Sequence, residues 1–308
     1  MPQSGTSPGD GARVDACTDV HYVDTGMYDT PGYGAVYVVD AERPAVLDTG
    51  IGTHHERVLD ALDEVGIARD DLGAIVVSHV HLDHAGGAGF LADACPNADV
   101  YVHEIGAPHL VDPADLVAGT KRAVGDQWRY YVDPEPVPES RIVELADGDR
   151  IDLGDRTLTA HHAPGHAPHQ VVLEDDRDGF VHTADAAGIW VPALSEVHET
   201  SPPPNFELET CLDDVATIRE RAPDVLLYPH FGPVADDVDG VLDEYATTLR
   251  EWVARVREKR AELDDDEAVE RYFAERTSLD EVWPAHKAEE EVAMNVRGVL
   301  VALDRRVA

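Results

Sequence analysis

Three histidines and an aspartate occur within six residues of the stretch SHVHLDHAGG, residues 78–87, which follows an apolar run. These residues are His79, His81, Asp83 and His84. A two-residue step places His79 and His81 on the same face of an extended segment. Imidazole nitrogens and carboxylate oxygens are the ligands that zinc and similar divalent ions prefer. Because one ion seldom uses all four groups, the cluster predicts two adjacent metal ions; the alternative is a set of surface histidines.

Residues of the same chemical types lie at expected strand ends or in loops elsewhere in the chain. His166 lies in APGHAPH, Asp185 in VHTADAAG and His230 in LLYPHFGP, while Asp48 ends an upstream run in AVLDTG. Each has a small or turn-forming neighbour, as is typical of a loop that leaves a strand. This recurrence favours a metal site assembled from several strand ends over scattered surface groups.

Taken in order over residues 20–235, the five stretches resemble the metallo-β-lactamase superfamily of metallohydrolases. The resemblance implies two triads of metal ligands, one from His79, His81 and His166 and the other from Asp83, His84 and His230. It also implies that Asp185 bridges the two metals. Asp48 would not bind metal but would orient the loop at its strand end by hydrogen bonding.

The resemblance further implies a fold and an activity. The fold is a mixed α/β sandwich of αββα type, with two sheets packed face to face between outer helices. The activity is hydrolysis, in which a hydroxide shared by two divalent metals attacks a thioester or ester carbonyl. Asp83 and Asp185 would orient this nucleophile. Zinc is the expected metal, and iron or manganese could occupy the same ligands.

Asp185 at the bridging position favours the hydroxyacylglutathione hydrolase-like branch, and the APGHAPH motif resembles that of archaeal metallohydrolases. Two alternatives remain open. A lactonase would typically carry a tyrosine three positions after Asp185, where this chain has Gly188. An iron-dependent oxidoreductase of the persulfide dioxygenase type could use the same ligands. The expected partner is in each case a small-molecule substrate.

The elements that must position these residues can be outlined from apolar periodicity. Short strands are expected at residues 20–23, 35–39, 45–47, 74–77, 99–102, 157–159, 171–173, 180–182 and 225–228. Helices are expected at residues 58–65, at 212–219 and throughout the chain after 238. We expect a disordered N-terminus at residues 1–13, a catalytic domain at 14–236 and a helical region at 237–308. The Pro-rich stretch 113–138 is expected to be an irregular lid.

Five aromatic residues are candidates for the wall of a substrate pocket: Tyr28, Tyr33, Trp128, Tyr131 and Trp190. The alternative for each is that it covers the hydrophobic core. The apolar stripes of the C-terminal helices must also be buried somewhere. These helices would either cap the site or form a homodimer contact.

The chain carries 62 acidic and 24 basic residues, a formal net charge of −38. This charge argues against nucleic acid or an anionic membrane as a partner, since both require basic patches. No apolar run reaches membrane-spanning length, and no secretory signal is visible, so a cytoplasmic protein is expected. The three cysteines form no CxxC motif. An acidic excess spread along the whole chain resembles the composition of proteins from salt-accumulating halophiles.

We predict that the protein unfolds in low salt. At molar salt the screening length falls to about 3 Å, so the acidic surface no longer repels itself. The measurement is the melting temperature in dilute buffer and in molar KCl. A melting temperature that is the same in both would contradict the prediction.

Overall fold

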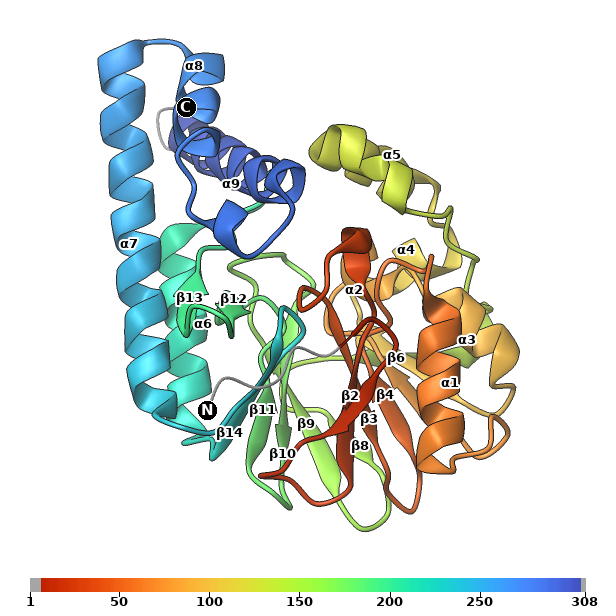
Figure 1. Ribbon diagram of the computed structural model, residues 1–308. Coiled ribbons are helices and arrows are strands. Elements are labelled where there is room, and N and C mark those ends of the chain that lie inside the picture. Colours follow the sequence, from red (N-terminus) through yellow and green to blue (C-terminus); the bar gives the residue numbers. More distant parts are fainter. Residues whose placement is uncertain (1–6, 306–308) are drawn as a thin grey trace.

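The computed structural model describes residues 7–305 and contains two β-sheets packed face to face (Figure 1). The first sheet has the order β1 (Gly11–Arg13), β2 (Val20–Asp24), β3 (Ala35–Val39), β4 (Ala45–Leu47), β5 (Ala74–Val76), β6 (Asp99–His103) and β7 (Ile142–Leu145). Its pairings are antiparallel from β1 to β4 and parallel from β4 to β7.

The second sheet has the order β15 (Gly232–Val234), β14 (Val225–Tyr228), β11 (Phe180–His182), β10 (Val171–Asp175), β9 (Thr157–His162) and β8 (Arg150–Asp152). Its neighbours are antiparallel except for the parallel pair β11 and β14. A separate hairpin, β12 (Ile189–Val191) and β13 (Glu196–His198), follows β11.

The two sheets share a buried apolar core. Tyr37 and Leu47 of the first sheet pack with Leu173 and Leu227 of the second, and all four side chains are fully buried. The Tyr37 hydroxyl also donates a hydrogen bond of 2.8 Å across the interface to the carbonyl of Tyr228. Because side chains alternate along a strand, the opposite faces of both sheets need their own cover.

Helices supply that cover and complete the four layers. The outer face of the first sheet packs against α1 (His55–Val65) and α3 (Ala88–Ala94), with α4 (Ala107–Val111) nearby. The second sheet packs against α6 (Leu208–Glu220) and the long helix α7 (Val238–Leu263), which lie beside each other in Figure 1. The expected αββα sandwich with a C-terminal helical region is therefore confirmed.

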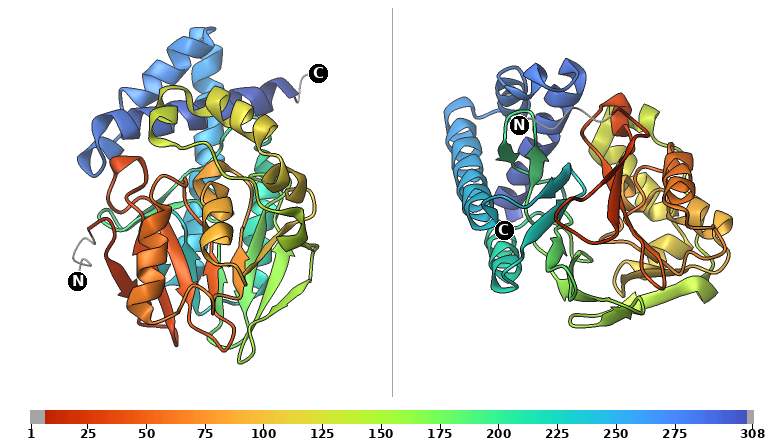
Figure 2. Two further views of the ribbon diagram at one scale, coloured as in Figure 1. Left: turned by 90° about the vertical axis from the view of Figure 1, so that its right-hand side faces the viewer. Right: turned by 60° about the horizontal axis from the view of Figure 1, so that its bottom comes forward.

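The C-terminal helices fold back over the sandwich. After α7 the chain forms α8 (Asp266–Ala274) and α9 (Ala285–Arg305), and α9 contacts α7, α8 and α5 (Ala114–Val124). Figure 2 shows α5 and α9 side by side above the sheets. On α9, a Cβ added at Gly298 would lie 1.7 Å from the carbonyl oxygen of Ser201. Only glycine lets this helix approach the loop after β13 so closely.

Two expectations are corrected by the structure. Part of the N-terminus expected to be disordered, Gly11–Arg13, forms β1 because its backbone pairs with β2; residues 1–6 of that stretch lie outside the described residues. Within the stretch expected to be irregular, α5 forms a regular helix of 11 residues. None of its side chains is fully buried, and the prolines on either side of it, Pro113 and Pro134, favour an irregular connection in the sequence. In the described part of the chain, no helix is both long and apolar enough to cross a bilayer.

Candidate metal centre

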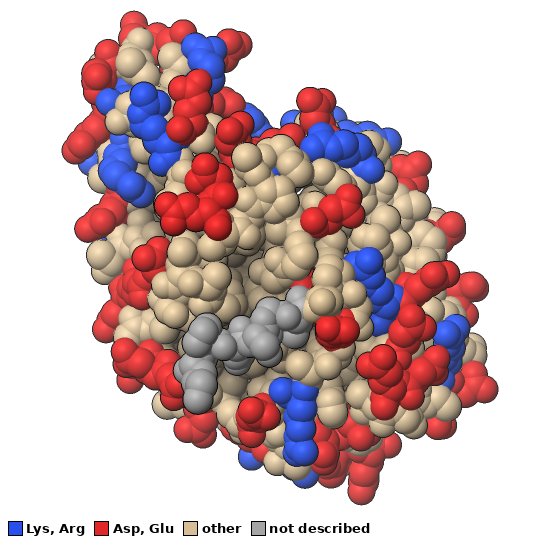
Figure 3. Space-filling model, in the orientation of Figure 1, with Lys and Arg blue, Asp and Glu red and all other residues tan. Residues whose placement is uncertain are grey.

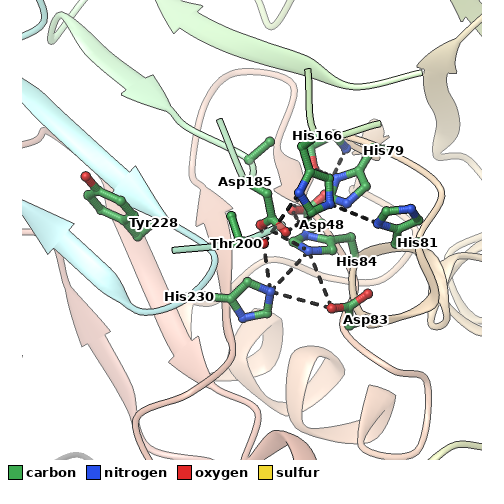
Figure 4. Close-up of polar contacts among 12 residues, drawn as sticks. Asp48, His79, His81, Asp83, His84, His166, Asp185, Thr200, Tyr228 and His230 are labelled. Carbon is green, nitrogen blue, oxygen red and sulfur yellow. Dashed lines mark hydrogen bonds and ion pairs between the residues drawn. The ribbon is translucent and has the colours of Figure 1, made fainter. Parts of the chain in front are cut away.

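The loops at one edge of the two sheets bring the candidate ligands together (Figure 4). β4 and β5 are parallel, so the residues that follow them, Asp48 and His79, emerge at the same edge. β11 and β14 are also parallel, and Asp185 and His230 follow their ends. All seven predicted ligands belong to sets of three residues, and within each set the donor atoms lie within 4.8 Å of one another. Two sets share no residue and are described below as the first and second groups. A third set, His79, His84 and Asp185, overlaps both.

The first group contains the side chains of His79, His81 and His166. His166 Nε2 lies 3.0 Å from His81 Nδ1 and 3.3 Å from Asp185 Oδ2. His79 is completely buried, and its Nδ1 lies 3.1 Å from the hydroxyl of Ser78. That contact leaves the His79 Nε2 available to the group.

The second group contains Asp83 and His84, at the start of the short helix α2 (Leu82–Ala85), together with His230. His230 Nε2 lies 3.2 Å from His84 Nε2 and 3.6 Å from Asp83 Oδ2. His230 Nδ1 faces away from the cluster and donates to the Tyr33 carbonyl at 3.1 Å. The Nε2 atoms of both histidines therefore converge with the Asp83 carboxylate.

Asp185 lies between the two groups. One of its carboxylate oxygens, Oδ2, faces His166 Nε2 in the first group at 3.3 Å. The other, Oδ1, lies 3.4 Å from His84 Nε2 and 3.8 Å from His230 Nε2 in the second. The two oxygens of Asp185 therefore face one group each.

The donor atoms are spaced as metal ligands would be. Two nitrogens bound tetrahedrally to zinc at 2.0–2.1 Å lie about 3.3 Å apart, close to the separations within each group. His79 Nε2 and Asp185 Oδ1 are buried without any hydrogen-bond partner among the described residues. Buried polar atoms without a partner are costly, and a cation at each group would satisfy them. The residues present therefore fit two divalent ions.

The charge balance of the cluster also fits cations. Burial lowers the pKa of His79 well below its usual value and that of His166 to about 3, so both imidazoles are neutral and can act as ligands. Burial would raise the pKa of Asp185, yet the neighbouring His84, His166 and His230 hold it far below its usual value. Buried carboxylates that stay ionised need compensating positive charge.

Asp48 supports the second group without joining it. Its carboxylate accepts hydrogen bonds from the backbone N–H and the hydroxyl of Ser78, at 2.8 and 2.9 Å, and from His84 Nδ1 at 2.9 Å. Burial opposes its ionisation, but His84 and His182 lower the pKa of Asp48 below the usual value. The backbone of Asp48 has a φ of 59°, a conformation that few residues other than glycine adopt. These contacts match the orienting role expected from the sequence.

Two further groups hold the loops that carry the histidines. The Asp214 carboxylate on α6 accepts a hydrogen bond of 2.7 Å from the N–H of Gly165, next to His166. Nδ1 of His169 accepts one of 3.3 Å from the N–H of Val80, in the loop between the first two histidines. Single-sequence patterns do not reveal either contact, since the partners lie 49 and 89 residues apart.

A cavity of about 520 Å³ opens onto the metal centre. Tyr28, Tyr33 and Tyr131 line it, as expected from the sequence. Trp128 and Trp190 are not among its lining residues, which corrects their assignment to the pocket. Trp128 stacks on the outer side of Tyr131 at a centroid distance of 5.1 Å, and Trp190 packs against the core residue Tyr228. Figure 3 shows one face of the molecule, with many acidic and fewer basic side chains around its rim.

Helix α9 contributes cavity residues that sequence reasoning missed. Glu291 and Met294 line the cavity. Glu291 accepts hydrogen bonds from the Tyr33 hydroxyl at 2.9 Å and from Lys287 Nζ at 2.7 Å. The Lys287 ammonium also lies about 4 Å from the ring centroids of Tyr28 and Tyr33. The C-terminal helices therefore form one wall of the site.

Comparison with known proteins adds a family match. The sequence profile of the Metallo-beta-lactamase superfamily matches residues 29–230, which contain all seven candidate ligands. The metallo-beta-lactamase fold-containing protein ST1585 of Sulfurisphaera tokodaii is 25% identical over 228 residues, covering 72% of this chain and 82% of that protein. The acyl-coenzyme A thioesterase MBLAC2 of Gallus gallus is 29% identical over 182 residues. That match covers 54% of this chain and 62% of the length of the thioesterase.

Solved structures share the fold. The structure of ST1585 from Sulfolobus tokodaii superposes with a TM-score of 0.70 at 22% identity, covering 92% of this chain and 99% of that one. The metallo-beta-lactamase family protein TTHA1429 from Thermus thermophilus has a TM-score of 0.62 at 21% identity, with 89% of each chain covered. At these identities the likeness supports the architecture alone.

The burial of Asp214 indicates that the native protein and the Asp214→Asn variant differ in stability by an amount that depends on pH. Burial raises the pKa of Asp214 to about 7, against the lowering effect of the Gly165 N–H. Because the folded state holds this proton more tightly than the unfolded state, the stability that it contributes is present below about pH 4 and lost as the pH rises through 7. Asp214→Asn keeps the accepting oxygen but does not titrate.

We therefore expect Asp214→Asn to exceed the native protein in free energy of unfolding at pH 8, by at most about 4 kcal/mol. The difference should shrink toward pH 5. Chemical denaturation in molar KCl at a series of pH values measures it. A difference that does not vary with pH would show that Asp214 is ionised throughout.

Proposed function

The chain belongs to the metallo-beta-lactamase superfamily, and on this premise we propose that it is a dinuclear metal-dependent hydrolase of thioesters or esters. The observation that carries the proposal is the position of Asp185, whose two oxygens face two separate groups of ligand atoms at 3.3 and 3.4 Å. A single-metal site would need only one of these groups.

One metal would be held by His79, His81 and His166 and the other by Asp83, His84 and His230, with Asp185 between them. Divalent ions held there would supply water of lowered pKa as the nucleophile and would polarise a substrate carbonyl. Zinc suits the nitrogen and oxygen donors, and iron or manganese would also be accepted.

The two carboxylates of the cluster have different access to the cavity. The side chain of Asp83 is 23% exposed, whereas that of Asp185 is 5% exposed. Asp185 is therefore confined to holding the two ligand groups together. Asp83 can reach the attacking water, accept its proton and pass it to the leaving group.

Tyr28 and Tyr131 supply hydrogen-bond donors in the same cavity. Their hydroxyl groups are hydrogen-bonded to each other, and both lie close enough to Asp83 for its charge to act on them. Burial raises the pKa of both phenols well above the usual value, so they stay protonated at neutral pH. A protonated phenol can donate to the carbonyl oxygen of a bound substrate as negative charge develops on it.

Support for a thioester comes from the relatives. The MBLAC2 protein is named an acyl-coenzyme A thioesterase, and it is 29% identical to this chain over 182 residues. A hydroxyacylglutathione hydrolase-like activity belongs to the same reaction class, and the carboxylate at Asp185 agrees with it. We propose small-molecule thioesters as the principal substrates, with esters and lactones as weaker ones.

The test is hydrolysis of a panel of acyl thioesters, aryl esters and lactones by zinc-loaded protein in molar KCl. We expect turnover of the thioesters, loss of activity with a chelator and recovery when zinc returns. Asp83→Asn preserves the side-chain shape and should lower kcat/KM at least about 100-fold. Asp93→Asn on the exposed side of α3 is the matched control and should not change it.

Two results would overturn the proposal. One is that the native protein hydrolyses every substrate no faster than the Asp83→Asn variant does. The other is protein purified with one iron per chain that consumes oxygen in the presence of a persulfide, which would place the same ligands in an oxidoreductase.

A further inference from the structure

The cavity above the metal centre continues between α5 and α9, away from the ligands. We propose that this part of the cavity binds the unbranched acyl chain of a thioester substrate, so that the enzyme prefers medium or long acyl groups. The proposal rests on the proposed function and adds a substrate class to it. It assigns the specificity to the C-terminal helix, which lies outside the region matched by the family.

The two walls are held together by direct contacts. Arg297 on α9 donates a hydrogen bond of 3.1 Å to the carbonyl of Ala123 on α5. Lys287 on α9 donates one of 3.2 Å to the side chain of Gln127, in the 3-10 helix Gly125–Tyr130 that follows α5. A pocket between two walls joined in this way is preformed, which reduces the entropy lost on binding a flexible chain.

The polar groups in the inner wall already have partners. Glu291 bonds with Lys287, Tyr33 and Asn295, and each of these side chains is buried. Both carboxylate oxygens of Glu291 already accept hydrogen bonds, so a polar ligand group next to this network gains little. The network therefore favours an apolar ligand.

The rest of the lining mixes apolar residues with polar ones and carries little positive charge. Leu116 and Val124 come from one wall, Met294 from the other, and Ile189 and Pro202 from the base. Among the described residues that line the cavity, Arg122 is the only lysine or arginine. Anionic groups such as the two carboxylates of glutathione would meet Asp115 and find one cationic side chain, Arg122, to pair with. A neutral hydrocarbon chain has no such conflict.

The cavity also has room for a chain. Its volume of about 520 Å³ is far more than a small acyl group such as acetyl needs and lies in the range of small-molecule sites. Gly119 of α5 lines it, and a Cβ added there would meet only the Arg122 guanidinium, at 3.9 Å. A larger side chain at Gly119 can therefore fill the pocket without disturbing the helix.

The experiment measures kcat/KM for S-acyl-N-acetylcysteamine thioesters from acetyl to dodecanoyl, with zinc-loaded protein in molar KCl. These substrates share one small neutral thiol, so only the acyl chain varies. We expect kcat/KM to rise about fourfold for each methylene that enters the pocket and then to level off. The acyl chain length at which kcat/KM stops rising gives the length of chain that the pocket holds.

Variants on the two walls test the location. Gly119→Leu and Met294→Trp should each lower the ratio of the decanoyl to the acetyl kcat/KM at least tenfold. Glu289→Trp adds the same indole to the exposed side of α9 and should keep the native ratio. If the native protein hydrolyses all chain lengths equally well, or if both wall variants keep the native ratio, the acyl pocket is refuted while the proposed function stands.

A binding measurement decides the case in which no thioester is hydrolysed. That result would refute the proposed function but would not bear on the pocket. Calorimetry with the unreactive thioether S-decyl-N-acetylcysteamine then tests the pocket alone. Binding that Gly119→Leu weakens at least tenfold supports it, and the absence of binding to the native protein refutes it.

Discussion

Five imidazoles and three carboxylates meet in the interior at one edge of the two sheets, and the concentration of negative charge there is the constraint on which the rest of the structure depends. Burial opposes the ionisation of Asp48, Asp83 and Asp185, yet their neighbours keep all three pKa values low. The same carboxylates raise the pKa of His84 well above its usual value, although burial alone would lower it. Positive charge is thus required at this point, and two divalent cations would supply it through the atoms that lack partners.

The scaffold can be understood as the means of holding these groups in place. Parallel pairs in each sheet deliver Asp48 and His79 from one side and Asp185 and His230 from the other. A second layer then fixes the orientation of the first: Asp48 holds His84, and the Tyr33 carbonyl holds His230. Ligands whose outer nitrogen is already bonded present the inner nitrogen in one direction. Function would therefore be sensitive to residues that never contact a substrate.

Much of this arrangement could be predicted from the sequence, because strong local patterns mark it. The stretch from His79 to His84 follows a short buried strand, and the order of the later motifs is typical of one superfamily. Around α5 the sequence predicts an irregular connection instead of a helix, because prolines lie on both sides of the helix and none of its side chains is fully buried. Trp128 was misplaced because an aromatic side chain has the same apolar character whether it faces a cavity or stacks behind another ring. The contacts of Glu291 and Met294 with the cavity depend on how α9 returns over the sheets, and no local pattern encodes that path.

The central claim is that two cations bind side by side, with Asp185 between them. Anomalous scattering from crystals grown with zinc, recorded on both sides of the zinc absorption edge, tests it most directly. The account predicts two peaks about 3.5–4 Å apart, the spacing of two-metal hydrolytic sites, one next to His166 and the other next to His230. A single peak, or peaks away from Asp185, would contradict it.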